Sequence, residues 1–272
     1  MQIKTTILKS CLTKLKLHNH LKQNLEPNII SNLKKIMKKI TIGLLAIAAI
    51  ISFQSAKAQT VEDIISKYIT ALGGKDKLLS IKTVKMVGSL NVQGMDVGVT
   101  TTEVNGVGTR NDISVPGMGE GYQVVNATKG WDFLPFMGQA SPEEISADQV
   151  KSSQGQLDLQ GVLVNYKEKG NQVELLGKEK VDTAECYKLK VTTKAGSEHI
   201  LFIDATTYYK VKTITKMKTP NGDTGIETGF GDFKKTDDGY VFPFSQTIER
   251  GTIVFTTIEV NKPVDEKMFT IN

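Results

Sequence analysis

The sequence predicts an α+β protein that is mainly antiparallel β, with one helix before a single sheet and a helical insert within it. Two observations support this prediction. A segment near residue 60 has the apolar spacing of an amphipathic helix, and a long series of runs after it alternates between apolar and polar residues. Strict alternation is typical of strands with one buried face, and the turn signals between the runs favour hairpins. About a dozen successive strands form a meander that can curl into an open or closed barrel.

The chain before this helix has the pattern of a secretory signal peptide. Lys38 and Lys39 precede an apolar run of 14 residues from Ile40 to Phe53, and the small-x-small sequence Ala56-Lys57-Ala58 follows. This order of segments is typical of secretory signals, whereas a membrane-spanning helix needs ~20 apolar residues. A buried core helix is the alternative, but the polar chain after Ala58 argues against it. We therefore expect residues 37–58 to be cleaved after Ala58, and the remainder to reach the periplasm without spanning the membrane.

Residues 1–36 precede this signal, are rich in lysine and contain one acidic residue, Glu26. A signal peptide normally starts a chain, so we expect translation to begin at Met37 and residues 1–36 to be a mis-called start; a basic extension is the alternative. Residues 1–58 hold ten of the 34 basic residues and one of the 29 acidic residues, which leaves 24 basic and 28 acidic residues and a net charge of −4 for the rest. Without a basic patch in that part, nucleic-acid binding is not expected.

The exported part, residues 59–272, is expected to be one domain that starts with a helix from Thr60 to Leu72. The apolar residues of this helix follow the spacing of one helix face: Val61, Ile64, Ile65, Tyr68, Ile69 and Leu72. Thr60 and Asp63 have the spacing of an N-terminal cap, and Gly73-Gly74 ends the pattern. Because one amphipathic helix cannot bury its apolar stripe alone, we expect it to lie on the sheet.

Twelve alternating runs are the expected strands of that sheet. They are Thr83–Val92, Met95–Val104, Gly108–Val115, Gln123–Asn126, Gly130–Phe133, Gln172–Gly177, Tyr187–Thr193, His199–Asp204, Tyr209–Met217, Thr224–Phe233, Val241–Arg250 and Thr252–Asn261. Turn signals such as Asn105-Gly106 and Asp238-Gly239 separate them, and these residues accept the positive φ that tight hairpins require. Successive hairpins make an antiparallel meander.

Between Phe133 and Gln172 the alternation stops and helix signals replace it. Ser141 as N-cap, Pro142 at the first helical position and Glu144 predict a helix that ends near Ser153. The segment Gln156–Asn165 has a second, weaker helical pattern. A helical insert in a meander most simply covers one face or one mouth of the sheet, so we expect this insert to act as a lid.

Few residues of the exported part are suited to catalysis. His199 is its one histidine and stands beside Glu198, where we expect a surface position. Cys186 is its one cysteine, so an intramolecular disulfide is excluded, and no nearby histidine activates the thiol. The exported part contains no His pair, Cys-x-x-Cys or calcium-loop motif. We therefore expect no enzymatic activity, no catalytic residue, no metal and no cofactor.

Large apolar residues gather instead at the entry to the helical insert. They are Trp131, Phe133, Leu134, Phe136 and Met137 around Pro135, with Met118 and Tyr122 upstream and Ile145 in the insert. One interpretation is an ordinary core seam, which suits any single one of these residues. The other is an apolar cavity in which they bind an acyl chain, since enclosing such a chain is worth ~0.8 kcal/mol per methylene.

Short segments along residues 60–272 have the order and composition of a known family. They are Ala71-Leu72-Gly73-Gly74, Lys129-Gly130-Trp131 with Pro135-Phe136, Leu176-Gly177-Lys178-Glu179, Tyr187-Lys188-Leu189-Lys190-Val191, Phe202-Ile203-Asp204 and Phe242-Pro243-Phe244. In this order the chain resembles the LolA/LolB-like superfamily, and more closely its outer-membrane lipoprotein-sorting proteins.

The resemblance implies an unclosed β-barrel with a helical lid over a hydrophobic cavity. It also implies a cofactor-free carrier that takes acyl chains of lipoproteins or lipids from an inner-membrane donor to an outer-membrane acceptor. In the better-known carriers an arginine beside a proline helps fasten the lid. Arg110 is the candidate for this role here, but no proline adjoins it, and a surface arginine is the alternative.

Two functions remain open from the sequence, because a fold by itself does not define a function. The first is a periplasmic carrier or binder of acyl chains, in lipoprotein sorting or envelope lipid transport. The second is a non-enzymatic interaction module of the cell envelope, with a barrel filled by its own side chains and no lipid. A measured cavity and co-purifying lipid would distinguish the two.

Overall fold

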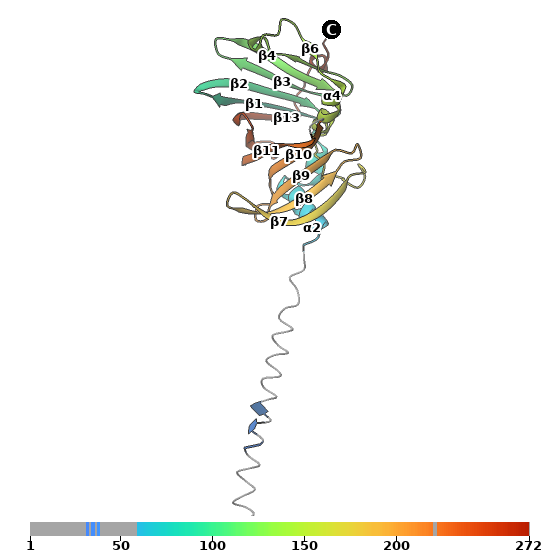
Figure 1. Cartoon of the computed structure of the whole chain (residues 1–272), viewed down its shortest axis with the longest axis vertical. Coiled ribbons are helices and arrows are strands. Elements are labelled where there is room, and N and C mark those ends of the chain that lie inside the picture. Colours follow the sequence, from blue (N-terminus) through green and yellow to red (C-terminus); the bar gives the residue numbers. More distant parts are fainter. Residues whose placement is uncertain (1–30, 33, 36, 39–58, 220–221, 272) are drawn as a thin grey trace, which may run out of the picture. The chain divides into compact units, whose positions relative to one another are not determined.

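The structure is a computed structural model that describes residues 31–32, 34–35, 37–38, 59–219 and 222–271 (Figure 1). Of the predicted signal peptide, only Met37 and Lys38 are among these residues, and the predicted cleavage site lies outside them. Residues Gln59–Asn272 form one unit of the chain, distinct from Met1–Ala58. Within the described ranges, no helix is both long enough and apolar enough to span a membrane.

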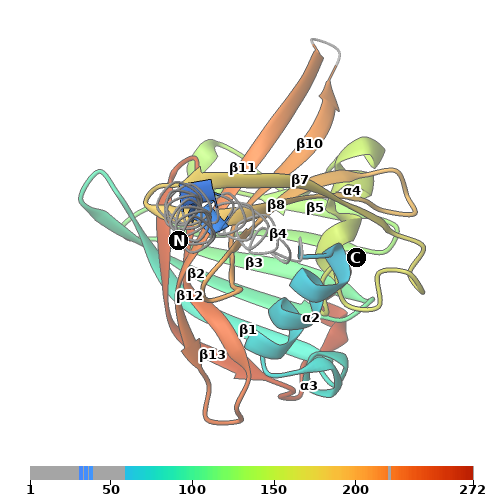
Figure 2. The same cartoon turned by 90° about the horizontal axis from the view of Figure 1, so that it is seen from below.

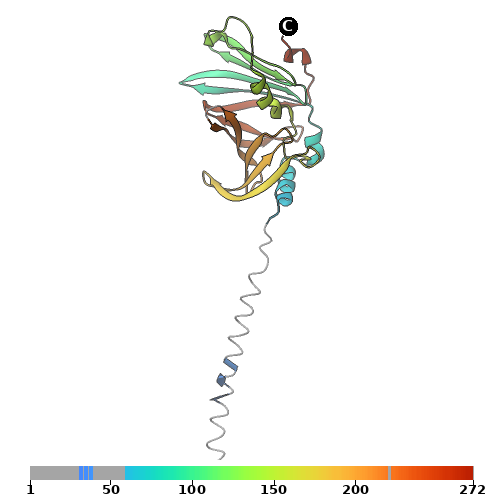
Figure 3. The same cartoon turned by 45° about the vertical axis from the view of Figure 1, so that its right-hand side comes forward.

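A single antiparallel sheet of 13 strands makes up most of the unit Gln59–Asn272. Figures 1 and 3 show this sheet from two sides. Its strands are β1 (Thr83–Val92), β2 (Met95–Val104), β3 (Gly108–Val115), β4 (Gly119–Asn126), β5 (Gly130–Phe133), β6 (Glu143–Glu144), β7 (Gln172–Val181), β8 (Ala184–Thr192), β9 (Glu198–Asp204), β10 (Lys210–Thr219), β11 (Gly222–Lys235), β12 (Val241–Ile248) and β13 (Gly251–Val260). Their order across the sheet is β6-β5-β4-β3-β2-β1-β13-β12-β11-β10-β9-β8-β7, so β6 and β7 are its edges and the sheet is not closed. The predicted mainly antiparallel architecture with an N-terminal helix is confirmed.

Helix α2 (Val61–Ala71) begins where the capping pattern predicted. The Asp63 backbone N–H donates to Thr60 Oγ1 at 3.1 Å, and the Thr60 N–H donates to Asp63 Oδ2 at 3.3 Å. This reciprocal pair is a capping box. The buried side chains of Ile64, Ile65 and Tyr68 pack against β8 and β9, so the predicted apolar stripe is buried on the sheet. Figure 2 shows the ribbon of α2 lying over the strands.

We define the inner face of the sheet as the face that packs against α2, and the outer face as the opposite one. On β8, Leu189 is buried against α2, whereas its neighbour Lys188 lies on the outer face and pairs with Glu179 at 2.7 Å. Side chains alternate along a strand, and directly paired residues share a face. The strand registers therefore assign the paired positions of the sheet to one face or the other.

Helix α3 (Lys75–Leu79) covers a second part of the inner face. Leu78 and Ile81 pack with Val84 of β1 and Ile258 of β13 in one buried cluster. Val164, from the loop after the helical insert, belongs to the same cluster and is fully buried. The inner face thus carries the two larger buried clusters among the described residues, those of α2 and α3.

The helical insert differs from its prediction. Ser141 and Pro142 are not helical, and the following Glu143–Glu144 is strand β6, paired with β5. Helix α4 (Ala147–Ser153) starts later because Ser146, not Ser141, forms a capping box with Gln149. Two 3-10 helices, η1 (Pro135–Met137) and η2 (Gln154–Leu157), flank this region. A loop continues to residue 171 where the sequence predicted the weak helix Gln156–Asn165, and Gly161 at φ 81° interrupts any helix there.

Candidate functional site

The inner face continues as an apolar surface beyond the parts covered by α2 and α3. We call this surface the apolar wall; it consists of Met86, Val97, Val99, Ile113, Phe242, Phe244 and Ile253, all half-buried. The strand registers place these residues on the inner face of five strands, β1, β2, β3, β12 and β13. Four of them, Met86, Phe242, Phe244 and Ile253, also pack against the α3 cluster. Each side chain of the apolar wall therefore keeps part of its surface accessible on the inner face.

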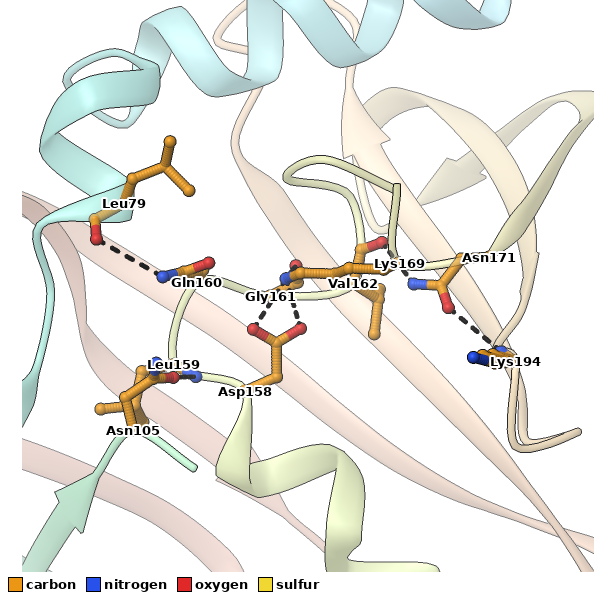
Figure 4. A network of polar contacts seen from close by, with 10 residues as sticks. All are labelled: Leu79, Asn105, Asp158, Leu159, Gln160, Gly161, Val162, Lys169, Asn171 and Lys194. Atoms are coloured by element: carbon orange, nitrogen blue, oxygen red, sulfur yellow. Dashed lines mark hydrogen bonds and ion pairs between the residues drawn. The ribbon is translucent and has the colours of Figure 1, made fainter. Parts of the chain in front are cut away.

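The inner loop, which we define as residues 158–171, connects separate parts of the inner face. Leu163 lies in the α2 cluster and Val164 in the α3 cluster, and both are buried. Asp158 and Lys169, at opposite ends of the loop, form an ion pair with an Oδ2–Nζ distance of 2.6 Å, and Lys169 Nζ also donates to the Gly161 carbonyl at 3.0 Å. The loop is therefore closed on itself by one lysine (Figure 4).

Three further contacts attach the inner loop to its surroundings, as Figure 4 shows. The Leu159 N–H donates to Asn105 Oδ1 at 3.1 Å, at the β2–β3 turn. Gln160 Nε2 donates to the carbonyl of Leu79, the last residue of α3, at 3.4 Å. At the other end, the Lys194 N–H donates to Asn171 Oδ1 at 3.2 Å. These contacts could not be predicted from the sequence, because each joins residues far apart in the chain or lies in a segment that was expected to be helical.

The aromatic residues predicted to line a cavity are divided between the two faces. Val84 of β1 is on the inner face, and the residues paired with it in turn across β2, β3, β4 and β5 are Glu103, Thr109, Val125 and Gly130. These four residues are therefore on the inner face as well. Trp131, next to Gly130, therefore lies on the outer face. Phe133 and Tyr122 are on the outer face as well, where their ring centroids are 5.7 Å apart.

Phe136 and Ile145 lie instead over the inner face. A Cβ atom on Gly121 would be 2.9 Å from Phe136 Cε1, and a Cβ atom on Gly130 would be 2.7 Å from Ile145 Cδ1. Both glycines occupy inner positions of β4 and β5, so glycine is needed there to admit these two side chains. Leu134 is half-buried, whereas Met118 and Met137 are 54% and 63% exposed. The structure thus brings only part of the predicted group together.

Arg110 contacts the C-terminal segment. Its Nε lies 2.8 Å from Asp112 Oδ1, its Nη1 donates to the Met268 carbonyl at 3.2 Å, and its guanidinium lies 4.2 Å from the centroid of the Tyr122 ring. Met268 belongs to the 3-10 helix η3 (Glu266–Phe269), whose buried Phe269 packs on the outer face with Val104 and Val124. The contacts of Arg110 are therefore on the face opposite to α2.

Polar residues also occur on the inner face. Burial raises the pKa of the Glu103 carboxyl to about 7 and lowers the pKa of the Lys210 ammonium to about 8. His199 is half-buried, and burial, with a smaller contribution from the charge of Lys210, lowers its pKa. The expectation that His199 is a surface residue was wrong, because it lies directly opposite Val191 on the inner face. The sequence did not predict these inner polar residues, because in an alternating strand a polar residue is normally expected on the exposed face.

Cys186 is fully buried on the outer face of β8, in phase with the lysines as expected. Burial is the largest cause of its raised pKa, which disfavours the reactive thiolate. In the part of the chain that the structure describes, no three His, Cys, Asp or Glu side chains are grouped closely enough to hold a metal ion.

No protein-family model matches this chain, and no curated protein matches it. Several solved structures do match it. A LolA superfamily protein from Nitrosomonas europaea is 14% identical, with a TM-score of 0.48, over 79% of this chain and 99% of that one. A DUF1329 family protein from Desulfovibrio piger is 16% identical, with a TM-score of 0.48, over 77% and 97% of the two chains.

A putative outer membrane lipoprotein-sorting protein domain from Vibrio parahaemolyticus is 15% identical, with a TM-score of 0.44, over 76% of this chain and 94% of that one. At these identities the similarity concerns the fold and carries no information about a ligand. The chain is thus structurally similar to a LolA superfamily protein and to a lipoprotein-sorting protein domain, the kinds of protein that its sequence resembles.

Proposed function

We propose that residues 59–272 bind acyl chains of lipids or lipoproteins on the apolar wall, in the periplasm and without enzymatic activity. The observation that carries this proposal is the apolar wall itself. Seven apolar side chains from five strands share the inner face, and all of them stay half-buried where α2 and α3 do not cover them completely. Contiguous apolar surface that remains accessible is a feature of ligand-binding grooves and of interaction sites.

The free energy of transferring an acyl chain out of water is large enough for a carrier. Transfer of a chain of about twelve carbons out of water is worth roughly 10 kcal/mol at ~0.8 kcal/mol per methylene, before the cost of ordering the chain. A surface that covers only part of such a chain gains only part of this transfer free energy. A segment that covers the rest of the chain increases the free energy gained. Residues that cover the inner face near the apolar wall, such as Phe136, Ile145 and the inner loop, are proposed as this lid.

The exported location and the partners belong to the same proposal. The sequence of residues 37–58 supports removal of a signal peptide after Ala58. An inner-membrane donor would supply the acyl chain and an outer-membrane acceptor would receive it. Arg110 and the outer residues Trp131, Phe133 and Tyr122 are not part of the apolar wall, and we propose that they fix the C-terminal segment instead.

One observation favours the alternative of an interaction module without lipid. At β8 and β9 the inner face is filled by the protein's own side chains, because Leu189, Leu201 and Ile203 are buried beneath α2. If the rest of the inner face were filled in the same way in solution, no acyl chain would bind. The test below therefore measures lipid directly.

Two adjacent aliphatic residues of β13 provide a matched pair of variants. Ile253 lies on the apolar wall, whereas Val254 is on the outer face and 51% exposed. We expect protein purified from its native envelope to carry lipid detectable by mass spectrometry, Ile253→Asp to abolish it, and Val254→Asp to retain it. The proposal would be contradicted if the native protein carried no lipid and also failed to bind a neutral fluorescent probe such as N-phenyl-1-naphthylamine. That result would favour the interaction module.

A further inference from the structure

Four polar side chains form a group on the inner face of β9 and β10. We call Lys210, Thr213, Thr215 and His199 the polar stripe. The register pairs Lys210 with Ile203, Thr213 with Leu201 and Thr215 with His199, and Leu201 and Ile203 are buried under α2. All four residues therefore share the face that carries the apolar wall. Strand β11 alone lies between the stripe and β12, which contributes Phe242 and Phe244 to the wall.

Two atoms of the polar stripe are buried without a hydrogen-bond partner among the described residues: His199 Nε2 and Thr213 Oγ1. Buried polar atoms in folded proteins are nearly always paired, so each exception needs an explanation, such as a water or a ligand. His199 Nδ1 lies 3.2 Å from Thr215 Oγ1. A neutral histidine that accepts from the Thr215 hydroxyl at Nδ1 carries its proton on Nε2. Both unpaired atoms can then act as donors.

Lys210 adds a positive charge to these donors. Its Nζ lies 4.4 Å from the centroid of the Phe230 ring, and within the described ranges it forms no ion pair. Burial lowers its pKa to about 8, so most of the population is still cationic at pH 7. The acid on the inner face of neighbouring β11, Asp232, pairs instead with Lys234 at 2.7 Å. Lys210 is therefore a half-buried cation without an anion.

We propose that the polar stripe binds the anionic head group of a single-chain amphiphile whose acyl chain lies along the apolar wall. One lysine with two neutral donors matches a head group with one negative charge, for which a fatty-acid carboxylate is the simplest case. A carboxylate accepts hydrogen bonds at both oxygens and forms its strongest ones with charged donors. This inference rests on the proposed acyl-chain function and specifies its ligand as an amphiphile with an acidic head.

The test compares two ligands that differ only in the head group. Dodecanoate and dodecan-1-ol displace the neutral probe N-phenyl-1-naphthylamine from delipidated protein, and the displacement gives a Kd for each. A charge-assisted hydrogen bond to a buried cation corresponds to about tenfold or more in affinity. We therefore expect the protein to bind dodecanoate at least about tenfold more tightly than dodecan-1-ol.

The matched variants are Lys210→Met and Lys212→Met. Lys212 is on the outer face of the same strand, where it pairs with Glu227 at 2.6 Å. We expect Lys210→Met to lose the preference for dodecanoate while its Kd for dodecan-1-ol stays unchanged, and Lys212→Met to keep both values. Thr213→Val, which removes one donor with little change in shape, should reduce the preference about threefold.

The possible failures are distinguishable. If the protein binds both ligands equally, or if Lys210→Met keeps the preference, the polar stripe is not a head-group site, although acyl-chain binding stands. If neither ligand displaces the probe and the probe itself does not bind, the acyl-chain proposal fails as well.

Discussion

Asp158 and Lys169 form an ion pair between the two ends of the inner loop, with both side chains about three-quarters buried (28% and 26% exposed). Because the loop joins the α2 and α3 clusters through Leu163 and Val164, this pair holds together the segment that covers the inner face.

The first prediction concerns this ion pair. Replacing Asp158 by Asn leaves Lys169 half-buried without its anion, which we expect to lower the free energy of unfolding by about 1–3 kcal/mol. The matched control is Glu62→Gln, which removes an exposed ion pair with Lys167, with side chains 60% and 66% exposed, and should change stability by less than about 1 kcal/mol. Urea denaturation measures both. Equal effects of the two substitutions would show that the inner loop does not depend on its ion pair.

A second prediction follows from Glu103, whose pKa is raised to about 7 by burial from an ordinary value of 4.5. Between these values the folded state binds more protons than the unfolded state, so this residue's contribution to stability falls as the pH rises from about 4.5 to 7 and stays constant above that. Glu103→Gln removes the cost of the buried charge. We expect it to stabilise the protein at pH 8 by up to about 3 kcal/mol, and to change little at pH 4.

Thermal unfolding at the two pH values tests this expectation. Glu259→Gln on β13 serves as the control, because Glu259 is exposed on the outer face and its substitution should not make stability depend on pH in this way. A Glu103→Gln variant that is equally stabilised at pH 4 and pH 8 would contradict the assigned pKa.

The third prediction has the opposite sign with pH and concerns Lys210. Its pKa is lowered from 10.5 to about 8, so the unfolded state binds more protons between these values and stability rises with pH across this window. The cost of the buried ammonium is therefore complete below pH 8 and disappears above about pH 10.5. We expect Lys210→Met to raise the free energy of unfolding at pH 7, by up to about 3 kcal/mol, and to have much less effect at pH 10.

Urea denaturation at pH 7 and pH 10 measures this effect, with Lys212→Met as the outer-face control. A protein stabilised by loss of a polar residue keeps that residue for another reason, and binding sites are common examples of this trade-off. If Lys210→Met is instead destabilising at pH 7, the ammonium has a partner in the folded protein and the polar stripe is already satisfied.

The sequence predicted the sheet well because period-2 alternation and turn residues are local signals. It also predicted α2 with its cap, since Thr60 and Asp63 lie within one helical turn. The helical insert was placed incorrectly because Ser141 and Ser146 each stand three residues before a Glu or Gln, and only tertiary contacts choose between them. In this case the pairing of Glu143 and Glu144 with β5 prevents the earlier start.

The candidate site was less accessible from the sequence for a physical reason. Which face Trp131 occupies depends on the register of every strand between β5 and β1, and local patterns do not contain that information. On β10 a bulge lies between Lys210 and Lys212, so two lysines of the same parity are on opposite faces. A β-bulge adds one residue to a strand and reverses the alternation after it. For this reason the alternation of the sequence does not distinguish Lys210, on the inner face, from the lysines of the outer face.

The last prediction separates two roles for Arg110. The resemblance to the LolA/LolB-like superfamily implied that it fastens the lid, with a surface arginine as the alternative, whereas its contacts are with Tyr122 and the Met268 carbonyl. We expect Arg110→Ala to increase amide hydrogen exchange in residues 264–271, because the C-terminal segment loses a hydrogen bond and a cation–π contact, each worth about 0.5–2 kcal/mol. Exchange in α4 should stay the same.

Arg110→Lys is the informative companion variant. Lysine keeps the charge near Asp112 and Tyr122 but lacks the planar fork that lets Arg110 bond Asp112 and Met268 together, so intermediate exchange is expected. Increased exchange in α4, with residues 264–271 unchanged, would reverse the assignment and restore the role in fastening the lid. One exchange experiment therefore decides whether Arg110 stabilises the C-terminal segment or α4.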